Sequence, residues 1–298
     1  MKSGFVSLVG RPNVGKSTLL NSIVGQKIAI TSEKPQTTRN IIQGIYNEED
    51  TQIVFVDTPG IHKPVHKLGK ILNKQAYYSI DDVDIILFLV DVSVKLGSGD
   101  KYVIEKLKEA KKPTILVLNK IDTISKDELL LKITEYKDLY EFQEIVPVSA
   151  YKKTNIDRLI QVIKNYLPDK VKYFSNEQVT NKLIDFLIAE IIREKVFQLT
   201  EEEVPHSTTC IVESIELGKT SNTINASIIV DRDSLKKIII GKQGAKIKEI
   251  GSLARVEIEE LMGKKIYLDL FVKTVKKWRD KDKYLSEFGY NDFKEWCI

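Results

Sequence analysis

Residues 10–17 read GRPNVGKS and carry residue types that bind phosphate. They fit the phosphate-loop pattern G-x-x-x-x-G-K-S, directly after an apolar run and directly before the helical stretch TLLNSIVG. In such a loop the backbone N–H groups and the N-terminus of the next helix point at the β-phosphate. Lys16 is then placed to bridge the β- and γ-phosphates, and the Ser17 hydroxyl suits Mg²⁺. Because a plain glycine turn does not require this context, we predict a nucleoside triphosphate site here.

The stretch DTPG at 57–60 ends a second apolar run. Asp57 can hold Mg²⁺ through water, and the Gly60 N–H can meet a γ-phosphate. An aspartate in a turn after a strand is common, so DTPG alone does not indicate a nucleotide site. It does so here because it follows a phosphate loop in the chain. We expect it to face the same edge of the sheet.

The stretch NKID, which begins at Asn119, predicts the base that is bound. Asn119 can fix the base from one side, and Lys120 can lie along the phosphate loop and the ring. The Asp122 carboxylate can accept hydrogen bonds from the N1–H and the exocyclic amine of guanine. Adenine lacks that donor pair and would leave a buried carboxylate unpaired, so this residue discriminates strongly. The dipeptide SA at 149–150 is a short match to the loop that backs guanine.

Each of these four motifs is short, but their order along the chain is specific. With this order, the first half of the chain resembles the small GTP-binding proteins of the P-loop class. The stretch PQTTRN at 35–40 offers a hydroxyl that would complete the Mg²⁺ shell only when GTP is bound. We predict Thr38 for this role, with Thr37 as the alternative. Ras-type proteins place a water-orienting glutamine where this chain has Ile61, so water is activated in another way or hydrolysis is slow. Related GTPases with this loop sequence suggest a potassium ion (K⁺) near Asn13.

Apolar runs of strand length alternate with helical stretches through the first 170 residues. Val, Ile and Leu dominate these runs, as strands that are buried on both faces of a sheet require. The predicted strands are 4–10, 52–57, 85–91, 114–120 and 145–150. The predicted helices are one that begins after Gly15 and those at 69–80, 98–111, 125–140 and 154–166. This alternation predicts an α/β fold with a doubly wound, mostly parallel sheet.

The pattern changes after Pro168, where a polar segment follows. We place a linker at 171–177, between a domain at 1–170 and a second domain at 178–298. The second half predicts the order helix, strand, strand, helix, loop, helix, strand. The corresponding residues are 176–199, 208–217, 223–231, 233–240, 241–244, 245–261 and 264–272.

The loop GKQG at 241–244 lies between two predicted helices. It follows a helix instead of a strand and ends without a hydroxyl for Mg²⁺, so a second nucleotide site is not expected. In this position G-x-x-G resembles the loop of the α+β type II KH domain, which clamps the backbone of about four nucleotides of single-stranded nucleic acid. The glycines let phosphates approach the backbone N–H groups, Lys242 and Lys246 supply charge, and flanking isoleucines offer a floor for bases. The alternative is a tight helix–helix turn with solvated lysines, which the element order disfavours.

The composition is ordinary for a soluble globular protein, with 298 residues, 42% apolar and 30% charged. No apolar run is long enough to span a membrane, no signal peptide is visible, and two cysteines are too few for a disulfide framework. These observations predict a cytoplasmic location. The net charge of +4 comes from residues 1–170, whereas residues 171–298 are balanced, so global charge indicates no partner. Local lysine clusters at 236–248 and 273–283 favour nucleic acid only together with the loop between the helices.

Taken together, these motifs are similar to those of the Era family of bacterial GTPases over nearly the whole chain. The matching stretches are GRPNVGKSTLLN, QTTR, DTPGIH, NKID, GKQG and VKKWRD. The resemblance implies a Mg²⁺-dependent GTPase that binds 16S ribosomal RNA near its 3′ end and acts in assembly of the small (30S) ribosomal subunit. It also implies peripheral association with the inner face of the cell membrane, and we expect a monomer.

Two alternatives stay open. One is a KH-bearing GTPase that acts on another RNA or on the large subunit. The other is an RNA-binding protein whose nucleotide site only stabilises the fold.

The candidate residues follow from these motifs. The residues expected to bind GTP or GDP are Gly10, Arg11, Pro12, Asn13, Val14, Gly15, Lys16, Ser17, Thr18, Asp57, Thr58, Pro59, Gly60, Ile61, Asn119, Lys120, Ile121, Asp122, Ser149 and Ala150. Those expected to act in catalysis are Asn13, Lys16, Thr38 and Gly60, and those expected to hold Mg²⁺ are Ser17, Thr38 and Asp57. The expected RNA contacts are Ile240, Gly241, Lys242, Gln243, Gly244, Lys246, Lys276, Lys277 and Arg279.

Overall fold

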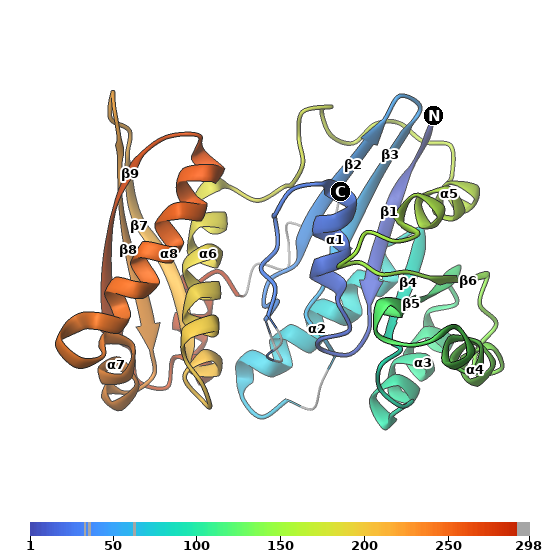
Figure 1. The fold of residues 1–298 in the computed structure, drawn as a ribbon, viewed down its shortest axis with the longest axis horizontal. Coiled ribbons are helices and arrows are strands. Elements are labelled where there is room, and N and C mark those ends of the chain that lie inside the picture. The colour runs from blue at the N-terminus through green and yellow to red at the C-terminus, as the bar shows by residue number, and fades with distance from the viewer. Residues whose placement is uncertain (33, 35–36, 62–63, 291–298) are drawn as a thin grey trace. The chain divides into compact units, whose positions relative to one another are not determined.

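The computed structural model describes residues 1–32, 34, 37–61 and 64–290. The chain forms two compact units, and Figure 1 colours it by residue number from blue at the N-terminus to red at the C-terminus. The first unit comprises Met1–Pro64 and Gly69–Asn181, and the second comprises Val65–Leu68 and Lys182–Ile298. The stretch NDFKEWCI at the C-terminus lies outside the described residues.

A six-stranded sheet with the order β2-β3-β1-β4-β5-β6 forms the centre of the first unit (Figure 1). Its strands are β1 (Lys2–Val9), β2 (Ile42–Glu48), β3 (Thr51–Asp57), β4 (Ile85–Asp91), β5 (Thr114–Asn119) and β6 (Glu144–Pro147). Every neighbouring pair except β2 and β3 is parallel. All residues of β3, β4 and β5 are buried, as strands that are covered on both faces require. The predicted mostly parallel α/β sheet is confirmed.

Strand β2 was not predicted. It lies at the edge of the sheet and pairs antiparallel with β3, with Ile45 opposite Val54. Its sequence IQGIYNE mixes a glycine and polar residues with isoleucines, so it has neither strict alternation nor a continuous apolar run. Pairing with β3, the next strand along the chain, therefore determines the position of β2 more than its own residue pattern does.

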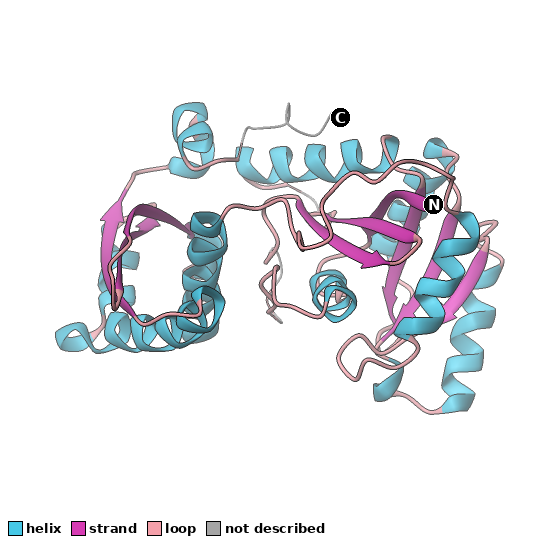
Figure 2. Cartoon of the chain, turned by 90° about the horizontal axis from the view of Figure 1, so that it is seen from above, coloured by secondary structure: helices cyan, strands magenta, loops and turns pink. Residues whose placement is uncertain are grey.

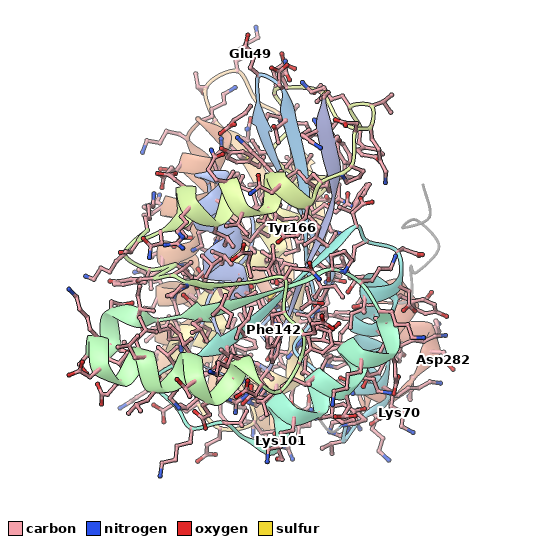
Figure 3. All side chains as sticks on the ribbon, turned by 90° about the vertical axis from the view of Figure 1, so that its right-hand side faces the viewer. Glu49, Lys70, Lys101, Phe142, Tyr166 and Asp282 are labelled. Atoms are coloured by element: carbon pink, nitrogen blue, oxygen red, sulfur yellow. The ribbon has the colours of Figure 1, made fainter. Side chains whose placement is uncertain are left out.

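Helices cover both faces of this sheet (Figure 2). They are α1 (Lys16–Val24), α2 (Lys67–Asp81), α3 (Ser98–Ala110), α4 (Lys126–Lys137) and α5 (Ile156–Tyr166), with a short 3₁₀ turn at Ile121–Thr123. Helix α4 begins with a capping box, in which Ser125 and Glu128 exchange hydrogen bonds. Figure 3 views this unit from the side, and Lys101 marks the solvent-exposed face of α3.

The segment that follows α5 belongs to the first unit and pairs with the edge of its sheet. The Ile45 N–H of the edge strand β2 donates to the Val179 carbonyl at 2.9 Å. The prediction of one helix over 176–199 is therefore wrong in its first part, because residues near Val179 pair with a strand. The helix itself, α6, covers only Ile184–Leu199.

The second unit has a three-stranded sheet, β7-β8-β9, with helices on one face (Figure 1). Its elements are α6, β7 (Thr208–Glu216), β8 (Asn222–Val230), α7 (Asp233–Ile240), α8 (Ala245–Met262), β9 (Ile266–Thr274) and α9 (Asp282–Glu287), with 3₁₀ turns at Pro205–Ser207, Lys242–Gly244 and Trp278–Asp280. Strand β8 pairs antiparallel with β7 and parallel with β9. Ile224 and Ile228 of β8 form one core with Ile192, Ile239 and Ile250 of the helices. The predicted order of elements is confirmed.

Among the described residues, no helix is both long and apolar enough to cross a membrane. Cys210 is buried as a free thiol.

Candidate functional sites

The phosphate loop joins the end of β1 to the start of α1. Gly15, which precedes α1, has φ of +95°, a conformation that L side chains rarely adopt. A Cβ there would lie 2.3 Å from Asn119 Nδ2, so the guanine loop approaches the phosphate loop closely at this point. Only glycine satisfies both the backbone conformation and the contact.

Lys16 lies within this loop and is 6% exposed. Its ammonium donates to the Arg11 carbonyl at 3.2 Å and to the Gly10 carbonyl at 3.4 Å. Burial lowers the pKa of Lys16, and the charge of Asp57 opposes this effect in part. A phosphate group would supply the negative charge and the acceptor oxygens that this buried ammonium needs.

Three oxygen-bearing side chains meet beside Lys16. The Ser17 hydroxyl donates to Asp57 Oδ2 at 2.6 Å and lies 2.8 Å from Thr38 Oγ1, which is 3.5 Å from the same carboxylate oxygen. Burial raises the pKa of Asp57, whereas Lys16 and the two hydroxyls lower it, and the net shift is upward. Its other oxygen, Oδ1, is buried and accepts no hydrogen bond from the described residues.

This donor set fits Mg²⁺, which prefers oxygen ligands and is commonly held by one or two carboxylates together with substrate phosphates. The described part of the chain holds no group of three or more His, Cys, Asp or Glu residues that could bind a metal ion. Thr38 lies at this position, whereas the Thr37 hydroxyl donates to the Lys34 carbonyl at 2.7 Å. The geometry therefore favours Thr38 for the role predicted from the sequence.

The loop DTPG lies against β1 and the phosphate loop. The Thr58 hydroxyl donates to the Leu8 carbonyl at 2.9 Å, which anchors the loop at the end of β1. A Cβ on Gly60 would lie 2.8 Å from Pro12 N, so the two loops are in close contact. Ile61 is buried at 5% exposure and has no group that could orient water.

The residues predicted to read guanine lie at the carboxyl ends of β5 and β6. Asn119 accepts the Ala150 N–H at 3.0 Å, and Asp122 Oδ1 accepts the Ser149 hydroxyl at 2.5 Å. Asp122 Oδ2, together with the remaining lone pair of Oδ1, can accept hydrogen bonds from a base. The structure thus brings the NKID and SA motifs into one site.

Asp91 is a residue of this site that the sequence analysis missed. It ends β4, and its carboxylate forms an ion pair with the Lys120 ammonium. Burial raises the pKa of Asp91, but hydrogen bonds from Lys120 and Ser93 outweigh this effect and lower the pKa overall. The sequence signal for Asp91 was its position at the end of an apolar run that directly precedes, in the order of strands, the run that ends in NKID.

In the second unit, the loop GKQG connects α7 to α8 as predicted. Gly241 has φ of +72° and Gly244 has φ of +79°, so both glycines adopt conformations that favour glycine. Lys242 and Gln243 between them are exposed. The backbone of the loop and its lysine are therefore accessible to a phosphate backbone.

Beside α8 lies a groove with a volume of about 330 Å³, which the sequence analysis did not predict. It is lined by Ile247, Lys248, Gly251, Ser252, Arg255, Ile266, Tyr267, Leu268 and Leu270, all from α8 and β9 or its start. Apolar side chains, an exposed aromatic ring and two cations are the chemistry that holds unstacked bases and their phosphates. The separation of Lys248 and Arg255 by two helical turns was a weak signal for this face.

Two of the predicted RNA contacts, Arg279 and Lys246, have donors that are engaged by other parts of the second unit. Arg279 is only 8% exposed, and its guanidinium binds Glu203 and Asp231 at 2.8 and 2.7 Å. Two of its donors are therefore engaged in ion pairs within the second unit, and its contact with RNA stays a prediction. Lys246 donates to the Leu199 carbonyl at 2.8 Å, at the C-terminal end of α6, and so is less available than Lys242. Lys276 and Lys277 are exposed, as expected.

The first unit is a P-loop domain that binds guanine nucleotides, and the second has the topology and glycine loop of a type II KH domain. Residues 5–120 match a family described as 50S ribosome-binding GTPase, and residues 203–279 match the KH domain family. The chain is 42% identical to a variant of Aquifex aeolicus Era bound to GDP·AlF₄⁻, with 97% of this chain and 99% of that chain covered and a TM-score of 0.94. The same identity, coverage and TM-score hold for Era in complex with MgGDPNP and nucleotides 1506–1542 of 16S ribosomal RNA. The chain belongs to the Era family of GTPases.

Proposed function

We infer that this chain is a GTP-hydrolysing switch that binds 16S ribosomal RNA near its 3′ end and acts in assembly of the 30S subunit. The observation that carries this proposal is the pairing of an exposed glycine loop, Gly241–Gly244, with the groove between α8 and β9. A chain that is 42% identical holds a 16S fragment of this region together with MgGDPNP. The fold, the loop and the groove supply the chemistry for the same ligand.

The residues of the first unit would divide the work on GTP. Asp122 reads guanine, and the backbone of the phosphate loop together with Lys16 holds the phosphates. Ser17, Thr38 and Asp57 would hold Mg²⁺, which would supply positive charge that neutralises the phosphates of the nucleotide. Thr38 can respond to the γ-phosphate because its hydroxyl already lies beside Ser17.

Water activation is a separate part of the proposal. Ile61 offers no side-chain donor or acceptor, so the Gly60 N–H and Lys16 are proposed to stabilise the transition state instead. Asn13 would help to hold a potassium ion, which would supply further positive charge. Slow intrinsic turnover is expected from this arrangement.

The location and assembly state are proposed from the family resemblance. The protein is expected to be cytoplasmic, to associate peripherally with the inner face of the cell membrane, and to be a monomer. The proposed domains are 1–170 and 178–298, joined by 171–177.

The experiment that tests the function is crosslinking of the GTP-loaded full-length protein in cell lysate, followed by sequencing of the attached RNA and sedimentation with 30S and 50S subunits. Reads that accumulate near the 3′ end of 16S RNA, with cosedimentation on 30S subunits, are expected. Reads in the large-subunit RNA would favour a large-subunit role, as the description of the matched GTPase family also suggests. GTP turnover that neither RNA nor subunits change would favour a nucleotide site that only stabilises the fold.

A further inference from the structure

Arg11, the second residue of the phosphate loop, is joined to α3 by a buried ion pair. Its Nε donates to Asp100 Oδ1 at 2.7 Å, and the side chains of Arg11 and Asp100 are 26% and 0% exposed. The other carboxylate oxygen accepts the Gly97 N–H at 3.0 Å, directly before the first turn of α3. One carboxylate therefore connects the phosphate loop with the start of a helix.

The surroundings of this pair match the arginine side chain. A Cβ on Gly99 would lie 2.6 Å from Arg11 Cδ, so the absence of a side chain there leaves room for the arginine stem. Tyr136 is 1% exposed; burial raises the pKa of its hydroxyl, and the Asp100 charge raises it further. Tyr136 thus stays neutral and adds no second negative charge to this buried site, where Arg11 is paired with Asp100.

The anchored residue also contacts the phosphate-binding ammonium. The backbone carbonyl of Arg11 accepts a hydrogen bond from Lys16 Nζ at 3.2 Å. Movement of Arg11 away from α3 would leave the fully buried Asp100 carboxylate without its cation, which is costly. The position of the loop backbone near Lys16 is therefore linked to the Asp100 ion pair.

We propose that Asp100 is a positioning residue for nucleotide binding, which fixes the phosphate loop through Arg11 without itself touching the nucleotide. The ion pair holds the backbone of the loop in the arrangement in which the Arg11 carbonyl meets Lys16, and this arrangement is taken to be the one that retains the phosphates. Loss of the pair therefore accelerates release of the nucleotide. The carboxylate lies 89 positions from Arg11 in the chain, in a helix outside the motifs that bind GTP.

The test is a double-mutant cycle in the full-length protein with Arg11→Met, Asp100→Asn and the combined variant. The release of a fluorescent GDP in the presence of Mg²⁺ is measured by rapid mixing, and the free energy of unfolding is measured without nucleotide. Each single variant is expected to release GDP about tenfold faster, and the combined variant no faster than either, because all three lose the same interaction. Glu105→Gln removes an exposed charge from the same helix and is expected to leave the rate unchanged.

Unchanged release in both single variants, or additive effects in the combined variant, would overturn the proposal. A loss of stability with an unchanged release rate would also overturn it, because that is the result of a purely structural pair. If Asp100→Asn does not fold, Gly99→Ala keeps both charges and displaces only the arginine stem. Faster release in Gly99→Ala supports the positioning role, and wild-type release excludes it.

Discussion

The side-chain amide of Asn119 donates a hydrogen bond to the Val14 carbonyl at 2.8 Å, and so joins the guanine loop to the phosphate loop. The same amide lies where any side chain on Gly15 would have to be. Two motifs that are more than a hundred positions apart are thus joined directly in one site. Loss of this hydrogen bond is therefore expected to weaken binding of the base and binding of the phosphates together.

Asp122→Asn is expected to reverse base preference. The amide can no longer accept from both the N1–H and the amine of guanine, so GTP affinity should fall by roughly 10⁴-fold, and xanthosine triphosphate should become the better ligand. Competition binding with GTP, ATP and xanthosine triphosphate measures this change. Equal affinity of the wild-type protein for ATP and GTP would contradict the assignment of Asp122.

Lys242→Asp combined with Gln243→Asp should weaken RNA binding. The two carboxylates face the phosphate backbone, while both glycines and the helix turn stay intact, so affinity should fall by at least ~10-fold and the salt dependence should become shallower. Titration of a short RNA from the 3′ end of 16S into the full-length protein measures both quantities. Lys219→Asp combined with Thr220→Asp makes the same charge change in the exposed β7–β8 turn and serves as the matched control.

Unchanged RNA affinity in the loop variant would reduce the loop to a plain helix–helix turn. An equal loss in the control variant would point to overall charge instead of the loop.

Replacing K⁺ by Na⁺ should slow GTP turnover, because Ile61 gives the protein no side chain that can orient water. Asn13→Ala should remove the difference between the two salts if Asn13 helps to hold the ion. Turnover at matched ionic strength is the measurement, with GDP affinity in both salts as the control. Equal rates in the two salts for the wild-type protein would exclude a role for K⁺.

Asp91→Asn should lower stability in a manner that depends on pH. The pKa of Asp91 is lowered below 3.8 by Lys120 and Ser93 against the effect of burial, so its charge stabilises the folded state above pH 3.8. That stabilisation is lost as the pH falls through the folded pKa. Urea unfolding at pH 7, 5 and 3.5 should show a constant difference from wild type at the first two values and a smaller one at the third. A difference that stays the same at pH 3.5 would argue against the ion pair with Lys120.

Arg279→Met should destabilise the second unit without weakening RNA binding at a temperature where the variant is folded. The substitution leaves Glu203 and Asp231 without their cation, and a loss of about 2–3 kcal/mol is expected, below the range for fully buried pairs because Glu203 is 47% exposed. Thermal unfolding and RNA titration on the same sample separate the two effects. RNA affinity that falls with full stability retained would return Arg279 to the RNA surface.

Much of the nucleotide site could be predicted from the sequence, because short motifs at the ends of apolar strands carry its chemistry. Thr38, Asp57 and Asp122 lie where their motifs place them, next to Ser17 and Ser149. Asp91 and Asp100 could not be found in the same way, because each acts through a partner that is distant in sequence.

The second unit shows the same limit. The loop Gly241–Gly244 was visible from two glycines and a lysine, but the groove beside α8 forms only when β9 packs next to that helix. In the sequence Arg279 is one more cation in a basic run, and only tertiary structure shows that its charge is balanced by Glu203 and Asp231. Periodicity also predicted a helix through Val179, where pairing with β2 outweighs local preference.

The pairing of Ile45 with Val179 has a consequence for self-association. Edge strands expose unpaired backbone groups that can recruit a strand from another molecule. At β2 this edge is partly covered by the segment after α5, which is also held by Gln52 through the backbone of Phe174. A first domain cut at residue 170 would lose this cover and present an open strand, and it should therefore associate with itself more readily than the intact chain.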